Sequence, residues 1–192
     1  MKNEVRLIGG QWKRSKLPVA DLPGLRPTPD RVRETLFNWL GQDLGGWSVL
    51  DAFAGSGALG FEAASRGAAA VTLLEREPKL VASLNASRQR LQAAHLRIER
   101  ADALAWMSAA PRASFDLVLL DPPFGAGLLA PAVAAAAPLL RDGGFLYVEA
   151  PEPLQSMPGG FELHRHSRAG AVHFHLLRRG YTAAVDTKRD AS

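Results

Sequence analysis

Residues 49–60 have the sequence Val-Leu-Asp-Ala-Phe-Ala-Gly-Ser-Gly-Ala-Leu-Gly, and this stretch decides the fold. An apolar run leads into glycines, and a helical pattern starts at Ala58. Glycine allows positive φ and lets a ligand approach the backbone closely, while the N-terminus of a helix favours negative charge. The stretch therefore predicts a strand, a ligand-binding turn and a helix, in that order.

The same alternation of strand and helix continues along the chain. Strands are predicted at residues 48–51, 71–75, 96–99, 116–120 and 145–149, and helices at 58–66, 79–91, 103–109 and 128–140. Two further extended segments, 161–167 and 171–177, flank Gly170 and predict an antiparallel hairpin. We therefore expect an α/β fold, with a mainly parallel seven-stranded sheet, helices on both faces and the hairpin at its end.

The first 41 residues differ from this pattern and are expected to form a small extension. Short extended pieces at 5–8 and 16–19 precede a helix, which Thr28 is expected to cap, with Pro29 at its first position. The apolar stripe of this helix is Val32, Leu36, Trp39 and Leu40, before Gly41 ends it. The predicted division is an extension at 1–41, an α/β domain at 42–180 and a polar tail at 181–192.

The distribution of charge along the chain indicates which kind of partner the protein binds. The formal net charge is +4, and residues 1–40 hold eight Lys or Arg against four acidic residues. Since the basic and acidic residues of the remaining chain balance, the excess positive charge lies in the extension, where it favours contact with phosphate. The candidates for contact with nucleic acid are Arg6, Trp12, Lys13, Arg14, Lys16 and Arg26.

Composition excludes several classes of protein. The chain has no cysteine, so disulfides, thiolate catalysis and cysteine-based zinc sites are excluded. No apolar run reaches the roughly 18 residues of a membrane span, and the N-terminus lacks the apolar segment of a signal peptide. The expected compartment is therefore the cytoplasm, and no membrane partner is expected.

Histidines alternate on the predicted hairpin, at positions 164, 166, 173 and 175. Alternate residues share a strand face, but no acid or cysteine is placed to complete a metal site. We therefore expect surface or RNA-facing histidines and no metal.

Gly55, Gly57 and Gly60 match the dinucleotide pattern G-x-G-x-x-G, which alone predicts NAD binding. Asp51 argues against NAD, because a carboxylate repels a pyrophosphate but attracts the ammonium and sulfonium groups of S-adenosylmethionine. Glu75, at the end of the next strand, suits the ribose hydroxyls of either cofactor. The expected cofactor is therefore S-adenosylmethionine.

Asp102 follows the third strand, where a carboxylate can accept a hydrogen bond from an adenine amino group. Cofactors of open α/β sheets bind at the carboxyl ends of the strands, where these acids are expected. The candidate cofactor-binding residues are Asp51, Phe53, Gly55, Ser56, Gly57, Gly60, Glu75, Arg76, Asp102 and Ala103.

Residues 121–124, Asp-Pro-Pro-Phe, stand at the end of the predicted fourth strand. Pro122 and Pro123 fix the backbone and remove two N–H donors, which leaves the Pro122 carbonyl rigidly placed. This carbonyl and the Asp121 carboxylate can accept the two N–H bonds of an exocyclic base amine and turn its lone pair toward a sulfonium methyl. Phe124 is expected to stack on the base, which completes the predicted catalytic motif.

Two motifs together resemble those of the amino-methylating class I methyltransferases, whose fold is Rossmann-like. They are Asp51-Ala-Phe-Ala-Gly-Ser-Gly and Asp121-Pro-Pro-Phe. Two further runs narrow the resemblance to one family of methyltransferases. They are Arg6-Leu-Ile-Gly-Gly-Gln-Trp-Lys and Gly24-Leu-Arg-Pro-Thr-Pro-Asp-Arg-Val-Arg-Glu. They resemble the bacterial 16S rRNA guanine-N2 methyltransferases that act on guanine 966 of the small subunit. The resemblance implies that the substrate is 16S rRNA, that the N-terminal helix lines the methionine end of the cofactor, and that Arg26 and Thr28 lie near the active site, with Thr28 among the cofactor-binding residues. The small size of the chain favours a guanine presented by an assembled or partly assembled 30S subunit.

Three alternatives remain. A DNA adenine-N6 methyltransferase would share the catalytic motif, but the chain has no room for a separate DNA-recognition domain. An inactive nucleic-acid-binding scaffold would not need Asp51, Glu75 and Asp102. A dehydrogenase that uses NAD is the weakest alternative. A monomer is expected.

Overall fold

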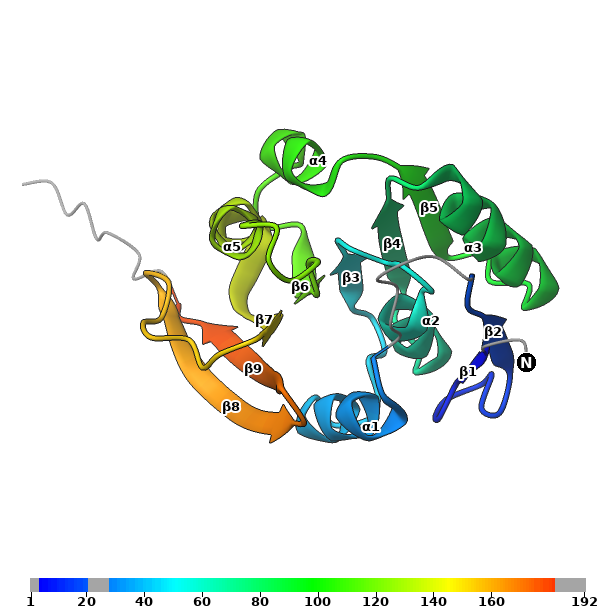
Figure 1. Cartoon of the computed structure of the whole chain (residues 1–192), viewed down its shortest axis with the longest axis horizontal. Coiled ribbons are helices and arrows are strands. Elements are labelled where there is room, and N and C mark those ends of the chain that lie inside the picture. Colours follow the sequence, from blue (N-terminus) through cyan, green and yellow to red (C-terminus); the bar gives the residue numbers. More distant parts are fainter. Residues whose placement is uncertain (1–3, 21–27, 182–192) are drawn as a thin grey trace, which may run out of the picture.

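The computed structural model describes residues 4–20 and 28–181. The strands of its main sheet are β3 (Ser48–Asp51), β4 (Ala70–Glu75), β5 (Leu96–Arg100), β6 (Phe115–Leu120), β7 (Leu140–Ala150), β8 (Phe161–Ala169) and β9 (Val172–Arg179). They form one seven-stranded sheet in the order β5-β4-β3-β6-β7-β9-β8 (Figure 1). The first five pair in parallel, while β9 runs antiparallel to both β7 and β8.

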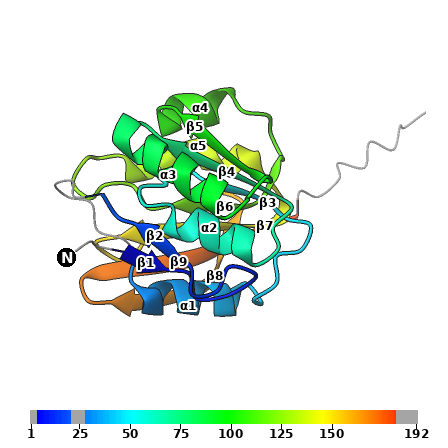
Figure 2. The same cartoon turned by 90° about the vertical axis from the view of Figure 1, so that its right-hand side faces the viewer.

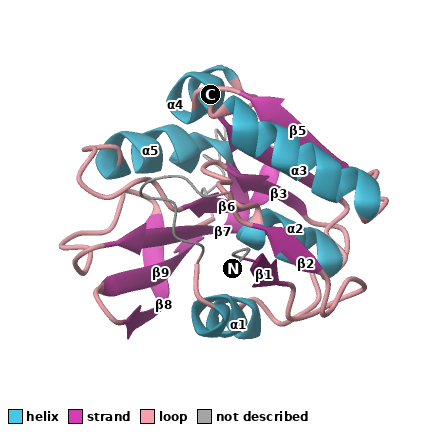
Figure 3. Cartoon of the chain, turned by 45° about the vertical axis from the view of Figure 1, so that its right-hand side comes forward, coloured by secondary structure: helices cyan, strands magenta, loops and turns pink. Residues whose placement is uncertain are grey.

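Helices cover both faces of this sheet (Figures 1 and 3). They are α1 (Asp30–Trp39), α2 (Ala58–Ser65), α3 (Pro78–Arg90), α4 (Ala103–Ala109) and α5 (Leu129–Ala136), with a short 3₁₀ helix at Ala137–Leu139. Buried residues of α1, α2 and α3 join one core cluster, and those of α4 and α5 join another. The predicted three-layer α/β architecture is therefore confirmed.

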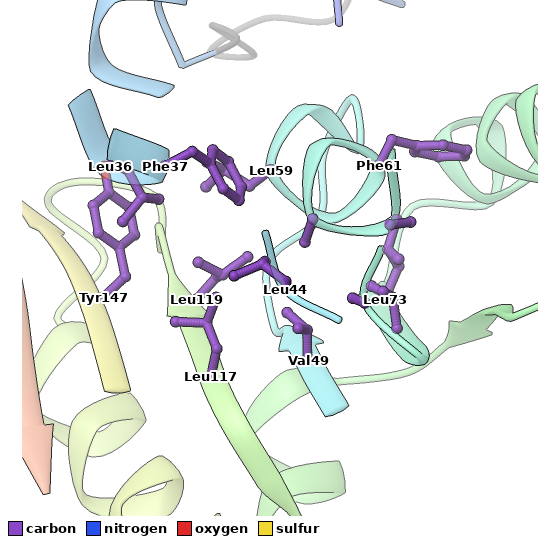
Figure 4. Packing of buried hydrophobic residues seen from close by; sticks show 14 of the residues in the cluster. Leu36, Phe37, Leu44, Val49, Leu59, Phe61, Leu73, Leu117, Leu119 and Tyr147 are labelled. Carbon is purple, nitrogen blue, oxygen red and sulfur yellow. The ribbon is translucent and has the colours of Figure 1, made fainter. Parts of the chain in front are cut away.

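Side chains of successive strand residues point to opposite faces, which determines the composition of each core. On β6, Leu117 and Leu119 join the core under α1 and α2, while Val118 and Leu120 join the core under α4 and α5. On β7, Tyr147 belongs to the first core, where it lies near Leu36 and Phe37 of α1 (Figure 4). This alternation also determines the face toward which side chains at the strand ends point.

The N-terminal extension shares the first of these cores. β1 (Glu4–Arg6) and β2 (Lys16–Pro18) form a small antiparallel sheet beside α2 (Figure 2). Leu7 and Leu17 are buried in the same cluster as Phe61 of α2. The extension is thus fixed against the main sheet by apolar packing.

Two predicted elements differ from the structure by more than two residues at one end. The helix expected at 128–140 ends at Ala136, because Pro138 lacks the N–H that would continue it. The strand expected at 145–149 starts already at Leu140, which pairs with Phe115 before a shift of register. Among the described residues, no helix is both long and apolar enough to cross a membrane.

Candidate active site

Four acidic residues lie at the carboxyl ends of four neighbouring strands. Asp51 ends β3, Glu75 ends β4, Asp121 directly follows β6, and Glu149 lies next to the end of β7. Each is an even number of residues from a side chain in the core under α1 and α2, so all four point toward that face. The sheet order β4-β3-β6-β7 places them side by side.

Asp51 is at the centre of this row and only 3% exposed. Its Oδ2 accepts a hydrogen bond from the Gly60 amide at 2.9 Å, which ties the strand to the first turn of α2. The pKa of Asp51 is raised to about 7, chiefly by burial and also by the nearby charges of Asp121 and Glu75, against the effect of the Gly60 hydrogen bond. No cationic side chain of residues 4–20 or 28–181 forms an ion pair with it, so the site favours a positively charged ligand.

Glu75 holds the glycine turn. Its Oε2 accepts from the Gly55 amide at 3.0 Å and its Oε1 from the Glu77 amide at 2.8 Å. A carboxylate has about four acceptor sites, so Glu75 keeps capacity for two ribose hydroxyls. At Gly57 a Cβ would come within 2.6 Å of Leu84, and its φ of +79° also favours glycine.

The other predicted cofactor-binding residues surround this turn. Gly60 has no room for a Cβ, which would lie 3.0 Å from the Asp51 carboxylate. Asp102 accepts from the Ala105 amide at 3.0 Å and so caps α4. The remaining positions are Phe53 and Ser56, both half-buried, Ala103, which is buried, and Arg76, which is exposed. Asp102 therefore has a structural role, with its second carboxylate oxygen open to a ligand.

The Asp-Pro-Pro-Phe motif lies where it was predicted, after β6. Pro122 is buried, and its carbonyl accepts no hydrogen bond from any described residue. Phe124 is 48% exposed, an unusual position for a phenylalanine unless it contacts a partner. Burial raises the pKa of Asp121 to about 6, against the effect of a hydrogen bond from Thr28.

The prediction for Thr28 as a helix cap was wrong. Pro29 is the N-cap of α1 and no side chain caps the helix. The Thr28 hydroxyl instead donates to Asp121 Oδ2 at 3.5 Å, and its carbonyl accepts from Arg33 Nε at 3.2 Å. The start of α1 therefore contacts the Asp-Pro-Pro-Phe motif.

Two residues of the site were not predicted from the sequence. Glu149 is 4% exposed, and the Tyr147 hydroxyl donates to its Oε1 at 2.8 Å. The pKa of Glu149 is raised to about 8, chiefly by burial and also by the charge of Asp121, against the effect of the Tyr147 hydrogen bond. The available signal was the position of Glu149 at the end of a predicted strand, which it shares with Asp51 and Glu75.

A buried ion-pair network joins the extension to this site. Arg33 and Glu62 are both fully buried, and Arg33 Nη1 lies 3.3 Å from Glu62 Oε2. Glu62 also pairs with Arg66 at 2.9 Å and accepts from the Ile8 amide at 2.9 Å. Arg33 also donates to the carbonyls of Thr28 and Arg6, so the network connects β1, α2 and the Thr28 segment that contacts Asp121.

Most of the predicted nucleic-acid contacts lie on the surface of the extension. Arg6, Lys13, Arg14 and Lys16 are exposed, and Lys16 pairs with Glu4 at 2.7 Å. Trp12 is half-buried and its ring stacks on His95, which makes it part of the packing of the extension. Arg26 lies outside the described residues.

The expectation for the hairpin histidines was wrong at His175. This side chain is 2% exposed, and burial lowers its pKa to about 4, with a further effect from the stacked ring of His166. Its Nε2 accepts from the Leu154 amide at 3.3 Å, a structural role. Among the described residues, no group of three or more His, Cys, Asp or Glu side chains is arranged to hold a metal ion.

Comparison with known proteins places this geometry in a family. The family model described as conserved hypothetical protein 95 matches residues 5–178. The chain belongs to this family. It is 43% identical to ribosomal RNA small subunit methyltransferase D of Escherichia coli, over 92% of this chain and 90% of that protein. The Haemophilus influenzae protein of the same name is 40% identical, over 92% and 95%.

Solved structures agree with this assignment. A structure described as a putative methyltransferase, yhhF from Escherichia coli, superposes with a TM-score of 0.84 at 39% identity and covers 93% of this chain and 99% of that one. The Rossmann-like methyltransferase fold expected from the motifs is therefore confirmed, and so is membership of a methyltransferase family.

Proposed function

We propose that this member of the family uses S-adenosylmethionine to methylate the exocyclic N2 amine of a specific guanine in 16S rRNA, in the cytoplasm. The observation that carries the proposal is the Asp-Pro-Pro-Phe motif beside the buried Asp51 at the end of the sheet. It combines two acceptors for an amine with a site that favours a cation. The choice of rRNA is supported by the names of the relatives.

The residues at the strand ends fit this cofactor. When bound, S-adenosylmethionine supplies an electrophilic methyl group, and it carries an ammonium and a sulfonium. Asp51 would favour these charges, because a nearby cation compensates the burial that raises its pKa. Glu75 would accept from the ribose hydroxyls, while the turn that it holds at Gly55 shapes the site.

The catalytic work of the chain is to orient the amine and to accept its proton. The Asp121 carboxylate and the free Pro122 carbonyl accept the two N–H groups, which turns the nitrogen lone pair toward the methyl donor. Phe124 is exposed beside them and stacks on the base, a contact worth about 1–3 kcal/mol. The nitrogen would take the methyl group as the bond between that methyl and the cofactor sulfur breaks, and it would lose a proton to Asp121.

The substrate form follows from the size of the chain. One basic extension supplies few phosphate and base contacts, too few to recognise a long sequence. Folded rRNA in an assembled or partly assembled 30S subunit presents the guanine already unstacked, which avoids a cost of a few kcal/mol. We propose that a monomer acts on this particle.

Incubation of the protein with labelled S-adenosylmethionine and three substrates tests the function. The substrates are small subunits from cells that lack the gene, free 16S rRNA and unmethylated DNA. We expect label in N2-methylguanine of the subunit. Label in N6-methyladenine of the DNA would instead support a DNA adenine methyltransferase.

Glu75→Ala is expected to weaken S-adenosylmethionine binding by about 1–3 kcal/mol, the cost of unpairing its hydrogen-bond partners. Calorimetry measures the affinity of both proteins. Lys79→Ala, an exposed substitution near the same strand end, is the control and should change little. An unchanged affinity in Glu75→Ala would remove Glu75 from the cofactor site.

Replacement of both Lys13 and Arg14 by alanine is expected to weaken RNA binding. Both side chains are exposed on the extension, whereas Lys16 already pairs with Glu4. The salt dependence, log K against log salt, should flatten by up to about 0.7 per lost phosphate contact on single strands. A double replacement of Arg100 and Arg112, exposed elsewhere, is the matched control. Equal slopes for the two double variants would make Lys13 and Arg14 ordinary surface charges.

A further inference from the structure

Arg33 carries a positive charge into the interior of the protein. It lies on α1, and its side chain is fully buried. An arginine is almost never fully buried unless its charge is paired and its donors are bonded. Buried ion pairs are a weak source of stability, since well-packed apolar residues of similar volume often serve as well. The contacts of Arg33 therefore indicate what it does besides stabilising the fold.

The Arg33 guanidinium donates to four different groups. Nη1 donates to Glu62 Oε2 of α2 at 3.3 Å, and Nη2 donates to the Arg6 carbonyl of β1 at 3.0 Å. Nη2 also donates to Asp30 Oδ1 at 2.5 Å, within α1. Nε donates to the Thr28 carbonyl at 3.2 Å, just before α1. Because the guanidinium is planar and rigid, it holds these acceptors at fixed positions relative to one another.

Glu62 fixes this guanidinium relative to the sheet. It is fully buried on α2, and its Oε1 accepts from Arg66 Nε at 2.9 Å. The helix α2 is in turn tied to β3 by the hydrogen bond from the Gly60 amide to Asp51. A shift of Arg33 relative to the strand ends would break several of these contacts, so its position there is determined by the main fold.

Thr28 connects Arg33 to the candidate active site. Its backbone is biased toward extended conformations because Pro29 follows it. Arg33 holds its carbonyl, and its hydroxyl donates to Asp121 Oδ2 at 3.5 Å. This distance is long for a hydrogen bond between two oxygens, but catalytic hydrogen bonds commonly shorten when the substrate binds. Both polar groups of Thr28 thus lie between the guanidinium and the carboxylate.

The Asp121 carboxylate needs a partner to fix its orientation. Rotation about the bond between Cβ and the carboxylate of an aspartate is only weakly restricted, so the backbone alone does not place the two oxygens. Thr28 donates to Oδ2, which leaves Oδ1 for the amine. An error of about 1 Å in the placement of a reacting group can cost about 100-fold in rate. A fixed Thr28 hydroxyl would therefore affect the rate of methyl transfer.

We propose that Arg33 is a positioning residue. By holding the Thr28 carbonyl, it places the Thr28 hydroxyl where this group orients the Asp121 carboxylate toward the amine. The proposal rests on the proposed methyl transfer. Because Arg33 also holds the Arg6 carbonyl of β1, the same side chain fixes the basic extension relative to the carboxylate that meets the target base.

The test is single-turnover methylation of small subunits that lack the modification, at saturating S-adenosylmethionine. Arg33→Lys keeps the charge beside Glu62, but its one nitrogen cannot replace three separated donors. Arg33→Met removes the charge and leaves Glu62 paired with Arg66. Both variants should lower the rate by about 10- to 100-fold, with S-adenosylmethionine affinity within a few-fold of the wild-type value. Arg31→Lys, at an exposed position of α1, should keep the wild-type rate.

Thr28→Val tests the last contact while the contacts of Arg33 stay in place. Valine has nearly the shape of threonine and offers the same carbonyl to Arg33, but it has no hydroxyl for Asp121. Its rate should fall by about 10-fold or more. Thr28→Ser keeps the hydroxyl and should recover most of the rate. Urea unfolding of each variant shows whether a loss of activity comes from a loss of fold.

Combined variants show whether Arg33 acts through Asp121. In a protein that already carries Asp121→Ala, Arg33→Met and Thr28→Val should each lower the rate by less than about threefold more, because the group that they orient is gone. A full effect of either change in that background would overturn the positioning role. A loss of S-adenosylmethionine affinity with an unchanged rate at saturation would also overturn it, because Thr28 would then act on the cofactor.

The outcomes separate the two proposals. A folded Arg33→Lys or Arg33→Met variant with the wild-type rate would overturn the role of Arg33 alone. A wild-type protein that gives no N2-methylguanine on the same subunits would overturn the proposed function, and this inference with it.

Discussion

Asp121→Ala is expected to lower kcat by about 10²- to 10³-fold, while S-adenosylmethionine affinity stays within a few-fold of the wild-type value. In the proposed mechanism the carboxylate orients the amine and accepts its proton, so its loss should affect mainly the transition state. Single-turnover methylation of small subunits measures the rate, and calorimetry measures the affinity.

Asp121→Asn separates the two contributions of this side chain. The asparagine oxygen still accepts one N–H bond, but the amide takes no proton, so its rate should lie between those of the wild type and Asp121→Ala. Asp116→Ala, on the same strand at its opposite end, is a control outside the site. If Asp121→Ala retained most of its turnover, the mechanism would be wrong.

Glu62→Gln is expected to lower the free energy of unfolding by about 3–5 kcal/mol, because it removes the buried counter-charge of Arg66 and leaves Arg33 only the half-exposed Asp30. Urea unfolding followed by tryptophan fluorescence measures this. Glu34→Gln, on the exposed face of α1, is the matched control and should change stability by less than about 0.5 kcal/mol. A similarly small effect for Glu62→Gln would show that water or a rearrangement of side chains makes up for the lost negative charge of Glu62.

The positions of the strand-end acids at the candidate site were predictable because their signals are local. Asp51 and Glu75 each close a short apolar strand, and Asp121 opens a proline pair directly after one. Parallel strands bring their carboxyl ends to one edge of a sheet, so each position followed from its own segment.

Glu149 was missed because its significance depends on a neighbouring strand. Its segment also ends an apolar strand, but only the pairing of β6 with β7 brings it beside Asp121. Thr28 was misassigned for a related reason. Its sequence context is that of a helix cap, whereas its hydroxyl bonds to a residue 93 positions away.

Arg33 shows a further limit of pattern recognition. Arginine is seldom fully buried, so a helical stripe is drawn from apolar residues, and Arg33 was counted among the charges of the extension. In the structure, Glu62 and Asp30 balance the positive charge of Arg33, and two backbone carbonyls accept further hydrogen bonds from its guanidinium. None of these contacts except the one to Asp30 lies within four residues of it, so local sequence does not reveal most of them.

The most direct test of the account is nucleoside analysis of 16S rRNA from cells that lack this protein. We predict the loss of one N2-methylguanine, restored by the intact gene and not by Asp121→Ala. A full complement of N2-methylguanine in those cells, together with a missing N6-methyladenine in their DNA, would contradict it.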